Sequence, residues 1–244
     1  GDSRGWSVVS MTTGRRTLAE VVQQLKSARA SGAALDVDDP EIVAAIREAG
    51  VPAVQVNAWH PDAGIDSVMQ DGQMAGLLAA RHLAQQGCRR VAWIGRYRRR
   101  AHSMDRLSGA MVGCDLEGLT LPPSRIVKLG REDQLEKARK LLSRKDRPDG
   151  VIAPFRGAVQ AVKTAAEELG LAIGSDLHLV GWSIEEGYET GYRRIFGKGP
   201  VAPAVTWSAK GMAEAAISRL AERRANPELQ PVRVKIPVRL RLAE

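Results

Sequence analysis

The chain has 244 residues, 44% of them hydrophobic, so it can bury a sizeable core as one domain or two compact lobes. No apolar run approaches the roughly 18 residues of a membrane span, and no secretory signal opens the chain, which predicts a cytoplasmic protein without a membrane partner. A net charge of +8 indicates anionic partners, but aromatic residues, at 4%, are too few for a binder of single-stranded nucleic acid.

Apolar runs of strand length alternate with amphipathic runs of helix length along most of the chain. The predicted strands are residues 8–11, 33–35, 51–56, 91–94, 126–129, 150–153, 177–180 and 232–242. The predicted helices are residues 18–28, 40–49, 72–86, 106–117, 133–143, 158–169 and 210–224. The second helix has the clearest start, because Asp39 is a capping acid and Pro40 stands in the first turn.

Strands separated by single helices indicate parallel sheets built from right-handed β-α-β units. The strands are almost continuously apolar, as expected of sheets covered on both faces. The predicted fold class is therefore α/β. Residues 184–203 interrupt the rhythm, and their glycine, tyrosine, arginine and proline content predicts a long, partly mobile loop.

The chain lacks the common catalytic motifs. Lys198 has neither the glycine spacing nor the hydroxyl residue of a phosphate-binding loop. No strand is followed by the three spaced glycines of a dinucleotide site, and Ser183 lacks the second glycine of a nucleophile elbow. The four histidines and two cysteines show no metal-ligand or redox spacing. We therefore expect no catalytic residue, no metal and no cofactor.

A series of specific motifs begins at residue 71. They are Asp71-Gly72-x-x-Ala75-Gly76, Arg81 to Ala84, Gly87 to Gly95, Asp105 to Gly109, Asp149 to Ala153, Glu168 to Leu171, Val180-Gly181, Pro203 to Thr206 and Ile236 to Val238. Each motif is weak alone, but together and in this order they resemble the effector-binding domain of LacI/GalR-type transcription regulators. That domain has the periplasmic-binding-protein-like type I fold.

A narrower resemblance lies near the start of the chain. Residues 6–9 and 35–42 are similar to the sensor half of xylose-type regulators, which carry an AraC-type helix-turn-helix pair after the sensor. The sequence leaves both branches open. A LacI-type DNA-binding module would precede this segment and a xylose-type module would follow it, and these 244 residues contain neither.

The resemblance implies two Rossmann-like lobes with parallel sheets, joined by crossover strands. The N-terminal lobe is expected at residues 1–67 plus 206–229, and the C-terminal lobe at residues 68–205 plus 230–244. The motifs begin at the family's second strand, so the N-terminal lobe is expected to lack the first strand and helix. The resemblance further implies a homodimer in which a small-molecule effector, bound between the lobes, controls DNA binding by the separate module.

Candidate ligand-binding residues follow the predicted strands, because ligands of parallel sheets bind beyond the carboxyl ends of the strands. They are Asp36, Asn57 and Trp59 in the N-terminal lobe, and Arg106, Phe155, Arg156, Trp182 and Ser183 in the C-terminal lobe. Arg106 is the principal candidate. The resemblance matches it to a ligand-contacting arginine at a helix start, and a guanidinium offers a fixed fork of donors. The two tryptophans offer flat faces for stacking on a ring.

The resemblance implies a sugar or sugar derivative as the effector. Pro154-Phe155 and Ser183 stand where the family has Asn-Asp and Asp, and Arg156 adds a positive charge. This combination favours an anionic derivative over a simple pyranose. Two alternatives remain, a solute-binding protein of a transport system and an enzyme on the same scaffold, because a fold does not determine a function.

Overall fold

The computed structural model describes residues 17–37, 39–58, 63–96, 101–130 and 133–242. These residues fall into two compact units. Unit 1 lies within residues 1–68 and 214–234, and unit 2 lies within residues 69–213 and 235–244. The strand predicted at residues 8–11 is outside the described residues.

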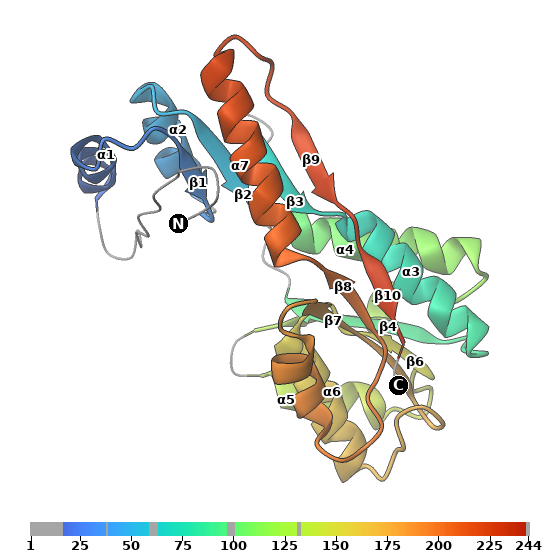
Figure 1. The fold of residues 1–244 in the computed structure, drawn as a ribbon. Coiled ribbons are helices and arrows are strands. Elements are labelled where there is room, and N and C mark those ends of the chain that lie inside the picture. Colours follow the sequence, from blue (N-terminus) through green and yellow to red (C-terminus); the bar gives the residue numbers. More distant parts are fainter. Residues whose placement is uncertain (1–16, 38, 59–62, 97–100, 131–132, 243–244) are drawn as a thin grey trace. The chain divides into compact units, whose positions relative to one another are not determined.

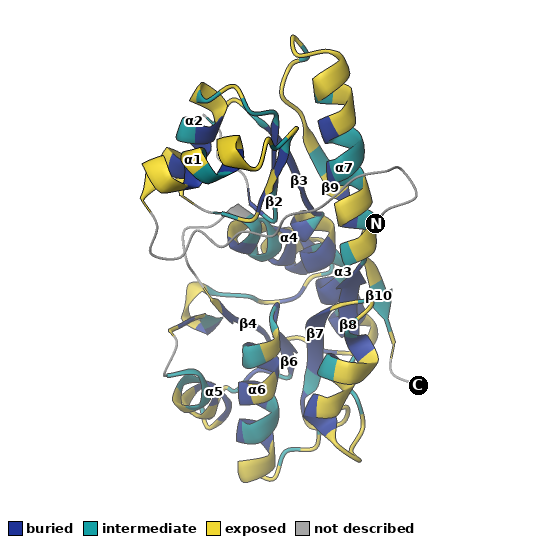
Figure 2. Ribbon diagram, turned by 60° about the vertical axis from the view of Figure 1, so that its left-hand side comes forward, coloured by how far each residue is buried: buried dark blue, intermediate teal, exposed yellow. Residues whose placement is uncertain are grey.

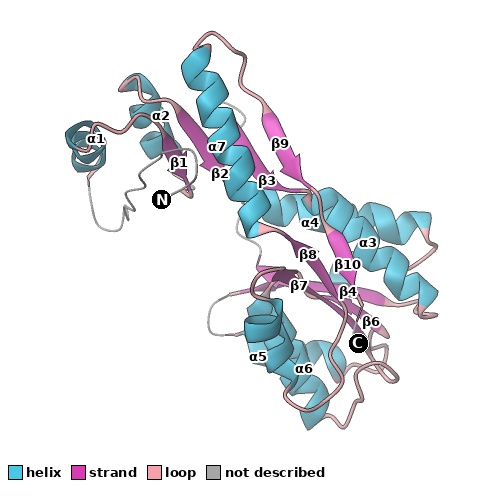
Figure 3. Cartoon of the chain, viewed as in Figure 1, coloured by secondary structure: helices cyan, strands magenta, loops and turns pink. Residues whose placement is uncertain are grey.

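Helices and strands alternate along most of the described chain, as Figure 3 shows. The α-helices are α1 (Leu18–Ser27), α2 (Pro40–Glu48), α3 (Gly72–Gln85), α4 (Ala101–Leu116), α5 (Gln134–Leu142), α6 (Arg156–Glu168) and α7 (Ala209–Ala225). The strands are β1 (Ala33–Leu35), β2 (Ala53–Val56), β3 (Asp66–Gln70), β4 (Val91–Arg96), β5 (Ile126–Leu129), β6 (Gly150–Ile152), β7 (His178–Ile184), β8 (Ala204–Trp207), β9 (Arg233–Ile236) and β10 (Arg239–Arg241). A short 3-10 turn, η1 (Pro123–Arg125), precedes β5.

Unit 1 is built on a four-stranded sheet with the order β1-β2-β3-β9. β1, β2 and β3 are parallel neighbours. α1 begins with a capping box between Thr17 and Glu20, and Asp39 accepts a hydrogen bond from the first turn of α2, as predicted. Both helices bury their apolar residues in a common core with β1 and β2.

A buried ion-pair cluster fixes the C-terminal part of α7 in unit 1. The carboxylate of Asp66 is fully buried, and it lies 2.9 Å from Arg219 Nε and 2.9 Å from Arg223 Nη2. It also accepts a hydrogen bond of 2.8 Å from the backbone N–H of Val232. Because a buried carboxylate needs charged or hydrogen-bonding partners, these contacts compensate its loss of hydration.

Unit 2 contains a six-stranded sheet with the order β10-β8-β7-β6-β4-β5. All its neighbouring strands are parallel except β10, which is antiparallel to β8. α3 and α4 cover one face of the sheet and α5 and α6 the other (Figure 1). The inner strands β4, β6, β7 and β8 are largely buried, the edge strands β5 and β10 are partly exposed, and the outer faces of α5 and α6 are exposed (Figure 2). The predicted α/β class with parallel sheets is confirmed.

The packing of α3 against α4 depends on glycine. A Cβ atom on Gly109 would lie 2.0 Å from the carbonyl oxygen of Gln73, and a Cβ on Gly76 would lie 2.2 Å from the backbone nitrogen of Ala110. The two helix backbones are therefore in direct contact. This contact fixes the position of the α4 backbone, including the carbonyl of Arg106, 2.5 Å from the Gly76 Cβ position.

The prediction of a mobile loop at residues 184–203 is wrong. The segment contains a π-helix, η2 (Tyr188–Tyr192), and a 3-10 helix, η3 (Arg193–Phe196). Tyr188, Tyr192 and Phe196 are buried, with neighbouring ring centroids 5.3 and 5.5 Å apart. The hydroxyl of Tyr192 donates a 3.0 Å hydrogen bond to the carbonyl of Pro203. Aromatic packing therefore orders a segment whose composition resembles a loop.

The predicted single strand at residues 232–242 is also wrong. The structure has two strands, β9 and β10, which belong to different sheets. Pro237 lies between them. Because proline has no N–H to donate, it interrupts strand pairing at this point.

Candidate functional site

The strongest candidate site lies in unit 2, at the carboxyl ends of β6 and β7. Arg106 reaches it from α4. The prediction that Arg106 stands at a helix start is wrong, because α4 begins at Ala101 and Arg106 is in its second turn. The sequence from Ala101 to Asp105 is compatible with a helix, and this allows the helix to begin earlier than expected.

The guanidinium of Arg106 is held on three sides. It lies over the indole of Trp182, with its central carbon 3.8 Å from the ring centroid. Nη1 donates a 2.9 Å hydrogen bond to the carbonyl of Pro154, and Nη2 donates one of 3.4 Å to Oε1 of Gln70. Nε is buried and has no hydrogen-bond partner among the described residues. The arginine is thus oriented by protein contacts while one of its donors remains unused.

Burial affects the ionisation of this arginine. It lowers the pKa of the Arg106 guanidinium to about 9, and the neighbouring Asp105 carboxylate opposes the shift. The side chain therefore stays charged at neutral pH. A charged guanidinium with limited hydration attracts an anionic or strongly polar ligand group.

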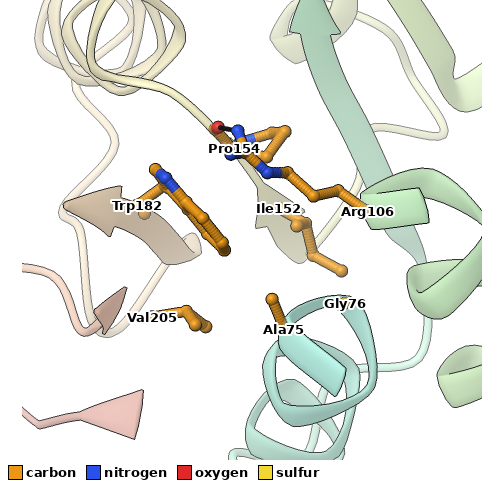
Figure 4. A pocket seen from close by; sticks show the side chains of 8 residues that line it. Ala75, Gly76, Arg106, Ile152, Pro154, Trp182 and Val205 are labelled. Atoms are coloured by element: carbon orange, nitrogen blue, oxygen red, sulfur yellow. Dashed lines mark hydrogen bonds between the residues drawn. The ribbon is translucent and has the colours of Figure 1, made fainter. Parts of the chain in front are cut away.

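A small cavity adjoins the pair. Its volume is about 10 Å³, and Figure 4 shows Arg106 and Trp182 on its wall, with Ala75 and Val205 opposite them. About one water molecule fits in such a space. A metabolite does not fit in it, so any larger ligand of this site must lie outside the cavity.

The structure places Trp182 and Ser183 within a strand instead of after one. β7 continues to Ile184 because Trp182 pairs with Val205 and Ser183 with Thr206 on β8. Ser183 is buried, and its hydroxyl donates to the carbonyl of Ile184 at 3.0 Å. Trp182 belongs to the site through its contact with Arg106, whereas no described contact links Ser183 to that arginine.

Phe155 and Arg156 begin α6, at the carboxyl end of β6. Phe155 is the N-cap residue and is half-buried, and Arg156 is the first helical residue and is exposed. The guanidinium of Arg96, the last residue of β4, lies 5.4 Å from the centroid of the Phe155 ring. A second arginine–aromatic pair therefore occurs at the strand ends of unit 2.

The candidates of unit 1 also follow their strands. Asp36 follows β1 and Asn57 follows β2, and the Asn57 amide donates a hydrogen bond of 3.3 Å to the Asp36 carboxylate. Asn57 has a φ of 64°, a left-handed conformation that asparagine tolerates better than most residues. Trp59 is outside the described residues.

Two contributors to the unit 2 site were missed in the sequence. They are the side chain of Gln70 and the carbonyl of Pro154. Gln70 is the last residue of β3, so the rule that selects strand ends could have found it. A backbone carbonyl carries no signal in the sequence.

Two searches of the described residues bear on other kinds of site. In this part of the chain no group of three or more histidine, cysteine, aspartate or glutamate side chains is placed to hold a metal ion. Among the same residues, no helix has the length and apolar character needed to cross a membrane.

Unit by unit, the parallel sheets and their covering helices define a periplasmic-binding-protein-like α/β domain. The model of the periplasmic binding protein-like domain family matches residues 80–242. The chain belongs to this family, and it is similar to the effector-binding domains of LacI/GalR-type regulators.

Individual relatives agree with this assignment. The chain is 26% identical over 188 residues to the HTH-type transcriptional repressor PurR of Escherichia coli O1:K1, covering 76% of this chain and 52% of the repressor. It thus spans about half the length of that curated relative. The structure of a complex of the transcriptional regulator CelR with cellobiose has a TM-score of 0.77 at 21% identity, covering 93% of this chain and 69% of CelR. A LacI family regulator from Enterococcus faecium with bound ribose has a TM-score of 0.74 at 17% identity, covering 92% and 82%.

Proposed function

We propose that this chain is the ligand-sensing domain of a transcription regulator and that it binds a sugar or sugar derivative at the strand ends of unit 2. The observation that best supports this proposal is the position of the Arg106 guanidinium, whose central carbon lies 3.8 Å from the centroid of the Trp182 ring. A fixed fork of donors beside an aromatic surface is suited to vicinal hydroxyls or a carboxylate. In support, the two structural relatives named above carry cellobiose and ribose.

The preferred ligand carries a negative charge. Arg96 ends β4, Arg156 begins α6 after β6, and the guanidinium of Arg106 reaches the same strand ends from α4; Arg96 and Arg156 are exposed. An anion near these arginines gains charge-assisted hydrogen bonds, which a neutral sugar makes more weakly. An acidic or phosphorylated sugar is therefore expected to bind more tightly than its neutral parent.

The ligand lies over the arginine–indole pair, because the cavity beside the pair has a volume of only about 10 Å³. Phe155, half-buried at the start of α6, offers a second aromatic surface at these strand ends. In unit 1, taken by itself, Asp36 and Asn57 offer acceptors and a donor of the kind that bind hydroxyl groups.

The rest of the proposed activity concerns the whole protein. A regulator of this kind works as a cytoplasmic homodimer, binds DNA through a module outside this chain and catalyses no reaction. In support, the curated relative PurR is named a transcriptional repressor. Such a regulator has one conformation that binds DNA and one that does not. The ligand controls DNA binding only to the extent that its affinity differs between these two conformations.

A thermal-shift screen tests the ligand class, with matched sets of sugars, sugar acids, sugar phosphates and nucleosides. A ligand at 100 times its dissociation constant stabilises the folded state by about 2.7 kcal/mol, which corresponds to a rise in Tm of about 5–10 °C for a domain of this size. We expect the largest shift from an anionic sugar. A larger shift from the neutral parent would contradict the proposed preference, and no shift from any member would contradict the sugar class.

A further inference from the structure

A second cavity lies in unit 1, at the amino ends of its parallel strands. Its volume is about 590 Å³, within the range of about 300–1,000 Å³ that is typical of small-molecule sites. Its walls are the segments that lead into β1, β2 and β3 and the C-terminal turn of α7. We call it the amino-end groove.

The amino-end groove is distinct from the strand-end candidates of the same unit. β1, β2 and β3 are parallel, so their amino ends share one edge of the sheet and their carboxyl ends the other. Asp36 and Asn57 follow the carboxyl ends. The three to five residues of each strand, at about 3.3 Å per residue, separate the two edges by roughly 10–17 Å.

The groove is cationic. Three arginines line it, Arg47, Arg223 and Arg224, and no carboxylate is among the described residues that line it. The charge of Arg223 is compensated by the buried Asp66. Nη1 of Arg47 donates a 3.2 Å hydrogen bond to the neutral carbonyl of Ala63. Among the described residues, the guanidinium of Arg47 therefore lines the groove without a carboxylate partner.

Two of these guanidiniums are held in place. Arg47 lies over Gly64, where an added Cβ would be 2.8 Å from Nη1, and the φ of +63° at Gly64 also favours glycine. Arg223 donates to the carbonyls of Pro227 and Leu229 as well as to Asp66. Arginine side chains that are already ordered lose less conformational entropy when a ligand binds.

The remaining wall of the groove is largely apolar, and Val51, Pro52 and Ile65 contribute to it. Apolar walls with a few ordered polar groups are typical of small-molecule sites, and a concave shape does not suit the convex surface of a DNA duplex. We propose that the amino-end groove binds a small organic anion, with its phosphate or carboxylate on Arg47 and its apolar body against Val51 and Ile65. This inference does not depend on the proposed sugar site of unit 2.

Calorimetric titration of the whole chain tests the proposal with three probes: phenyl phosphate, benzoate and the neutral benzyl alcohol. The key variant is Arg47→Gln, because Arg47 is exposed and its removal leaves the Asp66 cluster intact. Arg89→Gln is the matched control, an exposed arginine of unit 2 that does not line the groove. Arg106→Gln reports on the other site.

We expect at least one of the two anions to bind, benzyl alcohol to bind more weakly, and Arg47→Gln to reduce the anion's affinity about tenfold or more. Binding by phenyl phosphate alone would identify the charged group of the ligand as a phosphate, and binding by benzoate alone would identify it as a carboxylate. Arg89→Gln and Arg106→Gln should leave the affinity unchanged. Equal affinity of wild type and Arg47→Gln would overturn the proposal, as would a loss confined to Arg106→Gln or the absence of binding by both anions. A 12-base-pair duplex that displaces the anion and depends on Arg47 would instead assign the groove to DNA.

Discussion

The contact between α3 and α4 gives the sharpest stability prediction, for the substitution Gly109→Ala. The added Cβ would lie 2.0 Å from the carbonyl oxygen of Gln73 and 2.7 Å from its Cα and carbonyl carbon. These are backbone atoms, so no side-chain rotation relieves the clash. The helices must separate by more than an ångström to restore ordinary contact, which begins at 3.4 Å.

The magnitude follows from two opposing effects. Overpacking a well-packed core costs about 1–3 kcal/mol, and the rigid backbone neighbours of Gly109 place this substitution at the upper end. Replacing glycine by alanine inside a helix recovers about 1 kcal/mol. We therefore expect a net loss of about 2 kcal/mol, which lowers Tm by about 4–8 °C for a protein of this size.

Thermal and urea denaturation measure this effect, and Gly211→Ala is the matched control. Gly211 also lies in a helix, α7, but its Cβ position is 3.4 Å from the nearest atom, Ser208 Cβ. This variant should be as stable as wild type or more stable. If Gly109→Ala and Gly211→Ala had the same unfolding free energy, the direct backbone contact between α3 and α4 would be refuted.

Three further predictions concern other parts of the molecule. Glu186 accepts a hydrogen bond from the Ser208 hydroxyl and others from the backbone of the first turn of α7, and these lower its pKa to about 2. The stabilisation by ionised Glu186 is complete above the usual glutamate pKa of 4.5 and is lost as the pH falls towards 2. Glu186→Gln should therefore flatten the pH dependence of Tm between these values. An unchanged slope would argue against the role of Glu186 as a cap of α7. Asp66→Asn should destabilise the fold by about 3–5 kcal/mol in urea, because it leaves two arginines without their buried carboxylate, and a loss below about 1 kcal/mol would be inconsistent with this cluster. Burial raises the pKa of Cys88 and Cys114 to about 11, so a thiol reagent at pH 8 should label the folded chain slowly and the unfolded chain rapidly; equal rates would contradict their burial.

Periodicity and capping were sufficient to predict most of the fold. The alternation of apolar and amphipathic runs predicted the parallel sheets, and Asp39 with Pro40 marked the start of α2 correctly. The failures have local causes. Residues 184–203 have a loop-like composition, but Tyr188 and Tyr192 pack in the core and order them. β7 extends to Ile184 because β8 pairs with it, and a partner strand cannot be seen in a local pattern.

The candidate site was only partly predictable. The strand-end rule selected Arg106 and Trp182, which are in contact, and it also selected Ser183, whose described hydrogen bond is to the backbone. The carbonyl of Pro154 could not have been selected, because every residue has one. The amino-end groove was not predicted at all, since its arginines come from α2 and α7, which are far apart in the sequence.

The central claim is that the Arg106–Trp182 pair forms the effector site. Calorimetric titration of the most stabilising sugar derivative into Arg106→Gln, beside wild type and Arg89→Gln, tests it most directly. We predict that affinity falls about tenfold or more in Arg106→Gln, because a charged fork of donors is lost, and that Arg89→Gln matches wild type. A dissociation constant for Arg106→Gln equal to that of wild type would contradict the account.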